Sequence, residues 1–318
     1  MWASRENDDH VMPAGFYFEI EDTLWALGNL ARSSIARFSL SSGISTIVDK
    51  RGAGPGEFTY ADEVQLHPAG DTLLVFHGKR LSYFTVQLTE ARSVQTMVGS
   101  PAGMLVLPNQ QVIFVEPRIR QLARASGYVL HMFAQEGQYI KSFRPVDQVA
   151  SGDDWPIATG YEPNTLWLVE PGPNGFTLEQ WDAASTNRIH RFQVEPAWWQ
   201  SETRSPADYE KKASQKAVMT RLPTGPQAVA DAGHVLLVAL RQFDVQHDKA
   251  NFSHFEPHRW FDGVLLALDR KSGGILAAHV FDEFIFGFTN RGRLILYDAD
   301  ATGGPRIKLV EVTFQNAG

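Results

Sequence analysis

Five side chains that can ligate a metal ion lie close together near the C-terminal third of the chain: His247, Asp248, His254, Glu256 and His258. Imidazole and carboxylate groups are ordinary ligands of zinc and similar ions, and a folded loop could bring the three histidines onto one ion. The chain has no cysteine and no His-Glu-x-x-His pattern to hold two histidines on one helix face. The loop is therefore either a divalent-metal site at His247, His254 and His258 or, as we favour, a solvated polar loop or one that docks on a partner.

Other catalytic patterns are missing from the sequence. No Gly-x-Ser-x-Gly elbow occurs, so a serine hydrolase of that type has no support. The glycine-rich run from Gly52 to Gly56 lacks the Lys-Ser/Thr pair of a phosphate-binding loop, and no helix pattern follows it. Paired acids such as Asp153-Asp154 lie in predicted turns, where carboxylates usually accept hydrogen bonds from backbone amides. We predict no catalytic residue and no obligatory cofactor.

Aromatic residues gather in two segments that interrupt the strand pattern, at about 193–225 and 241–262. They are Trp198, Trp199, Tyr209, Phe252, Phe255 and Trp260. Aromatic side chains are enriched in the cores of protein interfaces. One interpretation is that both insertions pack on their own domain or plug a channel, and the other is that these six residues form a docking surface for a protein.

Composition narrows the class of protein. The chain has 318 residues with a net charge of −7, which argues against nucleic acid or an anionic lipid surface as a partner. It contains no run of 18 apolar residues, so we expect no transmembrane segment of its own. The first ten residues lack the apolar region of a signal peptide. The chain is then either cytoplasmic from Met1 or begins after a processed targeting segment.

A strand motif recurs six times and predicts the fold. In each copy a turn precedes an apolar run, as at Asp22–Leu27, Asp71–Phe76 and Asn164–Val169. Each copy has a short apolar segment before it and a second strand-like run after it, and the first five copies continue into a third. Four short strands per unit predict an all-β, six-bladed β-propeller of antiparallel blades in a single domain. A pair of β-sandwiches is the alternative, but it needs a linker that the composition does not show.

Two features complete the predicted architecture. The sixth unit lacks an outer strand, so residues before Gly15 are expected to supply it and close the ring. In the first insertion, Ser205 and Pro206 are typical of the start of a helix, which we expect to extend from about Pro206 to Met219. This short helical insertion is the one helix that the sequence predicts.

The stretch from Arg51 to Phe58 resembles the G-x-G-P-G-E-F connection of six-bladed propellers related to NHL-repeat proteins. Gly137–Phe143 is similar to an outer-strand pattern of the same group, and the resemblance extends from about Phe16 to Phe314. It implies a fold rather than an activity, because members range from binding modules to lyases and lactonases. Members are often exported by bacteria, so the resemblance also implies an extracytoplasmic or periplasmic location.

The expected function is that of a non-enzymatic propeller, a protein-interaction module or an accessory subunit of a larger assembly. A protein partner is expected, and a membrane-associated complex is one such partner. The alternative is a metal-dependent enzyme of the lactonase or lyase kind, or a binder of small ligands at the central channel. Stoichiometric metal in the purified protein would discriminate between these classes.

Overall fold

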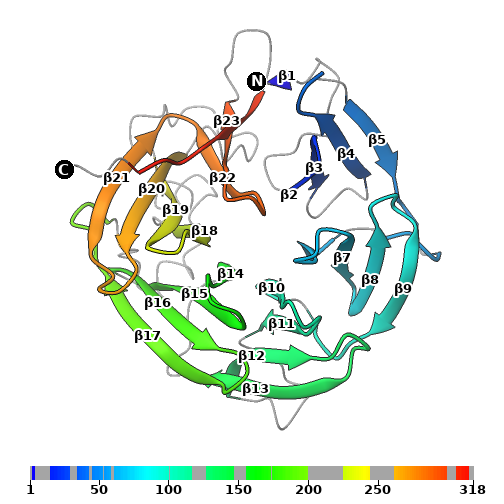
Figure 1. Ribbon diagram of the computed structural model, residues 1–318, viewed down its shortest axis with the longest axis horizontal. Helices are drawn as coiled ribbons and strands as arrows, with labels where there is room; N and C mark the ends of the chain where they lie inside the picture. Colours follow the sequence, from blue (N-terminus) through cyan, green and yellow to red (C-terminus); the bar gives the residue numbers. More distant parts are fainter. Residues whose placement is uncertain are drawn as a thin grey trace, which may run out of the picture.

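The computed structural model describes residues 2–3, 15–28, 34–42, 45–52, 54–58, 61–99, 101–116, 127–146, 155–172, 174–199, 225–243, 261–298 and 306–314. Their strands form six four-stranded antiparallel sheets, arranged as blades around a central axis (Figure 1). The protein is therefore a six-bladed β-propeller, as the repeated motif predicts. The described residues contain no helix, and therefore no helix that could cross a bilayer.

Each of the first three blades is formed by consecutive strands. Blade 1 contains β2 (Gly15–Ile20), β3 (Thr23–Gly28), β4 (Ser34–Ser39) and β5 (Ser45–Asp49). Blade 2 contains β6 (Glu63–Leu66), β7 (Thr72–His77), β8 (Arg80–Thr85) and β9 (Glu90–Gln95). Blade 3 contains β10 (Gly103–Val106), β11 (Val112–Val115), β12 (Tyr128–Phe133) and β13 (Tyr139–Pro145).

Blades 4 and 5 have longer strands, and blade 6 combines both ends of the chain. Blade 4 contains β14 (Ile157–Thr159), β15 (Thr165–Gly172), β16 (Gly175–Asp182) and β17 (Asn187–Val194). Blade 5 contains β18 (Gly225–Asp231), β19 (Val235–Phe243), β20 (Phe261–Asp269) and β21 (Ile275–Phe281). Blade 6 contains β22 (Phe284–Phe288), β23 (Leu294–Asp298), β24 (Arg306–Val310) and β1 (Trp2–Ala3).

The ring is closed by the N-terminal strand. β1 pairs antiparallel with β24, with Trp2 opposite Ile307 and Ala3 opposite Arg306. The prediction that residues before Gly15 supply the missing outer strand is therefore confirmed. Because β1 has only two residues, this strand pair is short.

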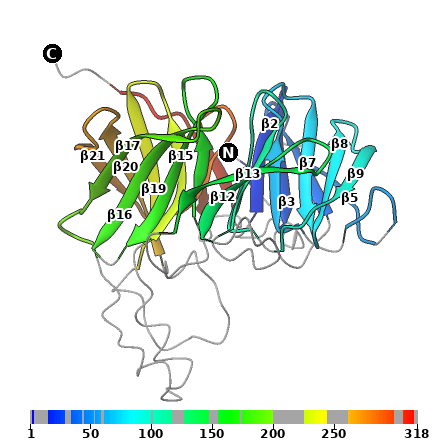
Figure 2. The same ribbon diagram turned by 90° about the horizontal axis from the view of Figure 1, so that it is seen from below.

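The hydrophobic core is divided among the spaces between blades. Six clusters of buried residues each combine side chains from two successive blades, including one between blades 6 and 1. Central strands are covered on both faces, so the Leu73–Phe76 part of β7 is buried at every position. The outer strand β9 instead alternates between half-buried and exposed residues, which is the pattern of a strand with one wet face. Figure 2 shows the blades from the side, with their strands running between the two faces of the ring.

The glycine-rich connection joins blade 1 to blade 2, as its turn residues predict. Phe58 is buried in the core between these two blades, and its backbone N–H donates to the Lys50 carbonyl at 2.8 Å. Gly56 has a φ of 74°, a conformation that favours glycine. The amides of Gly54 and Gly56 donate to the carboxylates of Glu57 at 2.9 Å and Glu90 at 2.5 Å. Both amides are thus paired within the protein, which supports a structural turn rather than a phosphate loop.

The predicted helix from Pro206 to Met219 lies outside the described residues, as does most of each insertion. The structure describes the strand ends on both sides of them.

Candidate functional site: an insertion face and a charged cluster beneath it

Both long connections meet the same end of blade 5: the first runs from blade 4 and enters blade 5 there, and the second leaves and returns there. The first ends where β18 begins, at Gly225, which pairs with Arg241 of β19. The second starts after Phe243 and ends at Phe261, and these two residues pair with each other. We call this end of the ring the insertion face. The β15–β16 turn from Gly172 to Gly175 lies at the corresponding end of blade 4.

Trp198 and Trp199 lie at the start of the first insertion, and both are half-buried. They pack against the core cluster between blades 4 and 5, and the Trp199 ring lies 5.8 Å from that of Phe176. The Trp199 amide donates to the Pro196 carbonyl at 2.9 Å, which fixes a turn after β17. The tryptophan pair therefore anchors the chain where it leaves blade 4, and part of each indole stays exposed.

The remaining predicted site residues lie outside the described residues. These are the interface candidates Tyr209, Phe252, Phe255 and Trp260 and the metal candidates His247, His254 and His258. Within the described part of the chain, no group of three or more histidines and acids is placed to hold a metal ion.

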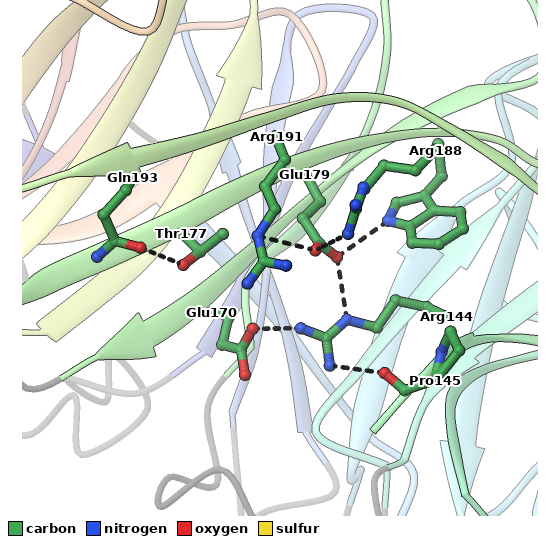
Figure 3. Close-up of polar contacts among 9 residues, drawn as sticks. Arg144, Pro145, Glu170, Thr177, Glu179, Arg188, Arg191 and Gln193 are labelled. Carbon is green, nitrogen blue, oxygen red and sulfur yellow. Dashed lines mark hydrogen bonds and ion pairs between the residues drawn. The ribbon is translucent and has the colours of Figure 1, made fainter. Parts of the chain in front are cut away.

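A buried ionic cluster that the sequence did not predict joins blade 3 to blade 4 (Figure 3). Arg144 of β13 is only 2% exposed, and its Nε donates to Glu179 Oε2 at 3.0 Å. The same guanidinium donates to the Glu170 carboxylate and, at 3.4 Å, to the Pro145 carbonyl. Arg144 has a φ of 61°, which is uncommon for a residue with a side chain.

Glu179 is the centre of the cluster. Its side chain is 1% exposed and accepts from Trp181 Nε1 at 3.1 Å and Arg188 at 3.3 Å, with Arg191 Nε at 3.7 Å. Three arginines therefore surround two glutamates, and Arg188 and Arg191 are partly exposed to solvent.

Glu170 is in a different electrostatic environment. Burial raises the pKa of Glu170 above its usual value, and the nearby charge of Glu179 acts in the same direction against the attraction of Arg144. A raised carboxyl pKa is one sign of a general acid. Both glutamates are nevertheless paired with Arg144, as Figure 3 shows. The arrangement is that of a structural ion-pair cluster that links blade 3 to blade 4.

Two further acids tie neighbouring blades at the opposite end of the strands. Glu19, in the innermost strand of blade 1, accepts from Arg293 Nε at 2.9 Å and from Thr289 Oγ1, both of blade 6. Asp231, in the innermost strand of blade 5, accepts from Trp167 Nε1 of blade 4 at 2.8 Å. In both cases a buried carboxylate at the end of an innermost strand binds the preceding blade.

A cleft of about 240 Å³ lies between blades 3 and 4, lined by Leu107, Asn109, Gln111, Met132, Ile140, Lys141, Asn164, Ala183 and Ala184. Its one charged group, Lys141, donates to the Ala184 carbonyl at 2.8 Å. The described residues that line it include no acid and no histidine.

Comparison with known proteins identifies the fold class. The sequence matches no protein-family model and no curated protein. A solved member of the DUF4221 family from Bacteroides vulgatus has a TM-score of 0.61 at 10% identity, covering 97% of this chain and 96% of that one. A candidate exported protein from Bacteroides fragilis has a TM-score of 0.61 at 9% identity, covering 94% and 83%. A chain of the Mitotic Checkpoint Complex has a TM-score of 0.53 at 10% identity, covering 94% and 87%. Identities this low show the shared propeller fold alone.

Proposed function

We propose that this propeller is a non-enzymatic protein-interaction module, an accessory subunit whose insertion face receives a protein partner. The observation that carries the proposal is that the two long connections meet the same end of blade 5. Gly225 pairs with Arg241, and Phe243 pairs with Phe261, so both insertions begin or end at the same end of one blade.

The composition of the two insertions supports a binding role. They contain Tyr209, Phe252, Phe255 and Trp260, in segments that have no place in a four-stranded blade. Long connections that carry aromatic residues on a rigid scaffold are typical of recognition surfaces. Trp198 and Trp199 pack on the blade 4–5 core and so anchor the start of the first insertion to the propeller.

The test is affinity capture from extract of the source cells, followed by identification of partners and capture in the reverse direction. We expect the captured partner to be lost when Tyr209, Phe252, Phe255 and Trp260 are together replaced by serine. Trp198 and Trp199 are less suitable targets, since truncating half-buried core side chains also lowers stability.

Tyr161→Ser is the matched control. Tyr161 is an aromatic residue that is 72% exposed in the turn before β15, at the opposite end of the blade from the insertion face. This variant should retain the partner. Retention of the partner by the fourfold variant, or the lack of any partner that survives reverse capture, would contradict the proposal.

Elemental analysis of the purified protein tests the competing class of function. Zinc or calcium at one ion per chain, lost in a His247→Ala, His254→Ala, His258→Ala variant, would favour a metal-dependent propeller enzyme instead.

Two finer assignments belong to the same proposal. The Arg51–Phe58 connection supports a relationship to the NHL-repeat group, and the exported members of that group support a location outside the cytoplasm. Fractionation of source cells with an antibody to the protein tests the location. Recovery in the cytosolic fraction would contradict it.

A further inference from the structure

The outer strand of blade 5 has an unusual surface. All six residues from Ile275 to Val280 are exposed, and the large apolar side chains among them are 45% exposed at Ile275, 58% at Leu276 and 56% at Val280. β21 lies at the rim of the ring, where it pairs with β20 on one side only (Figure 1). It therefore presents unpaired backbone groups and apolar side chains together.

The other outer strands of more than two residues carry charges. Asp49 lies in β5, Glu90 and Arg92 in β9, Lys141 in β13, and Arg188 and Arg191 in β17. Charged residues on an edge strand discourage pairing with another chain. Among these strands β21 alone, with the sequence Ile-Leu-Ala-Ala-His-Val-Phe, has no Asp, Glu, Lys or Arg.

We propose that two copies of this chain associate through β21, which joins blade 5 of each into one eight-stranded antiparallel sheet. An antiparallel strand pair between identical edges has two-fold symmetry, so the same patch serves both subunits. A second copy fits because the strip is uncharged. The chain as a whole has a net charge of −7, yet β21 places no like charges opposite each other in this arrangement.

The β-bulge in this sheet limits the register. Pairing with β20 shifts between Ala267 and Leu268, so Leu276 is the extra residue and the regular pairing covers Ala277–Phe281. Because no residue of β20 lies opposite Leu276, this residue stands outside the regular hydrogen-bonded ladder. The intermolecular ladder is then expected along Ala277–Phe281, with Leu276 packing at each end.

The dimer should be weak and favoured by salt. One strand pair buries less than the roughly 1,600 Å² of a standard interface, so we expect dissociation constants on the order of micromolar. Added salt screens the repulsion between two acidic chains without weakening apolar contacts, so it should strengthen association.

Sedimentation velocity of the full chain over a range of concentrations is the first test. We expect a monomer–dimer equilibrium that Leu276→Glu and Val280→Glu each shift toward monomer by at least about tenfold in the dissociation constant, or 1.4 kcal/mol. The matched control is Ile189→Glu, because Ile189 is 45% exposed on the charged outer strand β17. This variant should dimerise like the parent.

Cysteine cross-linking tests the geometry directly, since the chain has no cysteine of its own. Single variants Ala277→Cys, Ala278→Cys and His279→Cys are oxidised at a concentration that favours the dimer. At least one should give a disulfide-linked dimer in higher yield than Ile189→Cys.

A monomer at every concentration and salt would overturn the proposal, and would leave β21 to a strand from a different protein. A dimer that Leu276→Glu and Val280→Glu leave unchanged would overturn it as well. Circular dichroism of each variant shows whether loss of the dimer comes from the edge or from unfolding. None of these results depends on the insertion face.

Discussion

The junction between blades 6 and 1 and the junction between blades 3 and 4 use buried ion pairs in different ways. At the closing junction Glu19 meets Arg293, and the two are 274 residues apart in the chain. At the blade 3–4 junction Glu179 meets Arg144, which is 35 residues away. The first pair joins the two ends of the chain, whereas the second strengthens a contact that chain connectivity already favours.

The two junctions also differ in how much water reaches the arginine. Arg293 is 26% exposed beside a fully buried Glu19 carboxylate, while Arg144 and Glu179 are 2% and 1% exposed. An arginine that loses its partner can be hydrated in the first place but not in the second. Burial therefore sets the free-energy cost of breaking each ion pair. The position of the pair in the ring decides whether its loss weakens ring closure or only a contact between consecutive blades.

The largest effect is expected at the blade 3–4 junction. Glu179→Ala leaves Arg144 with Glu170 as its one carboxylate among the described residues and removes the acceptor of Trp181 Nε1. We expect a loss of about 3–5 kcal/mol in the free energy of unfolding, measured by urea denaturation. Glu179→Gln keeps the shape and one acceptor oxygen and should cost clearly less. Equal losses for both variants would show that packing, not charge, dominates this junction.

Breaking the closing pair should cost less. Glu19→Ala removes the acceptor for Arg293 and Thr289, but the freed guanidinium can be hydrated. We expect a loss of about 1–3 kcal/mol. The double variant Glu19→Leu/Arg293→Met should recover most of it, because no buried charge then lacks a partner. A loss above that of Glu179→Ala would reverse the order of the two junctions.

Deleting residues 1–12 removes β1 from the closing junction and should lower the melting temperature by about 2–4 °C, equivalent to about 1 kcal/mol. The deletion and Glu19→Ala weaken the same junction, so their effects should not be additive. The deletion and Glu179→Ala act on different junctions and should add. Additive effects in both pairs would mean that β1 and Glu19 do not cooperate in closing the ring.

The sequence predicted the ring but not its polar ties, for a physical reason. Buried blade strands such as Leu73–Phe76 are visible in the sequence as local apolar runs. The missing outer strand of the sixth unit followed from counting the strand-like runs in each unit. The pairing of Glu19 with Arg293 depends on how the ends of the ring meet, which no local pattern encodes. The alternating pattern of Gly137–Phe143 could not show that the next residue, Arg144, adopts a left-handed conformation and is buried.

The surfaces show the same limit. The apolar sequence of β21 is typical of a buried strand, and only its place at the rim reveals it as exposed. Trp198 and Trp199 stood out as interface candidates by composition, whereas the structure places both partly in the blade 4–5 core. Their role in an interface stays a prediction, as do those of Tyr209, Phe252, Phe255 and Trp260.

The smallest predicted effect is a pH dependence of opposite sign at the two junctions. Burial alone would raise the pKa of Glu19, but hydrogen bonds from Arg293 and Thr289 and the charges of Arg293 and Arg291 outweigh it and hold this pKa below its usual 4.5. The folded state thus binds the Glu19 proton less readily than the unfolded chain. The stability that Glu19 contributes is complete above pH 4.5 and is lost as the pH falls through the depressed pKa.

Glu170 behaves in the opposite way. Its raised pKa means that the folded state takes up a proton at a higher pH than the unfolded chain, so acidification toward 4.5 favours folding. Melting temperatures of Glu19→Gln and Glu170→Gln are compared with the parent from neutral to acidic pH. The difference in melting temperature between the parent and Glu19→Gln should shrink only below pH 4.5. The melting temperature of the parent should rise relative to that of Glu170→Gln already above pH 4.5 as the pH falls. If both differences in melting temperature change in the same direction as the pH falls, the prediction is wrong, and burial of Glu170 does not set its proton affinity.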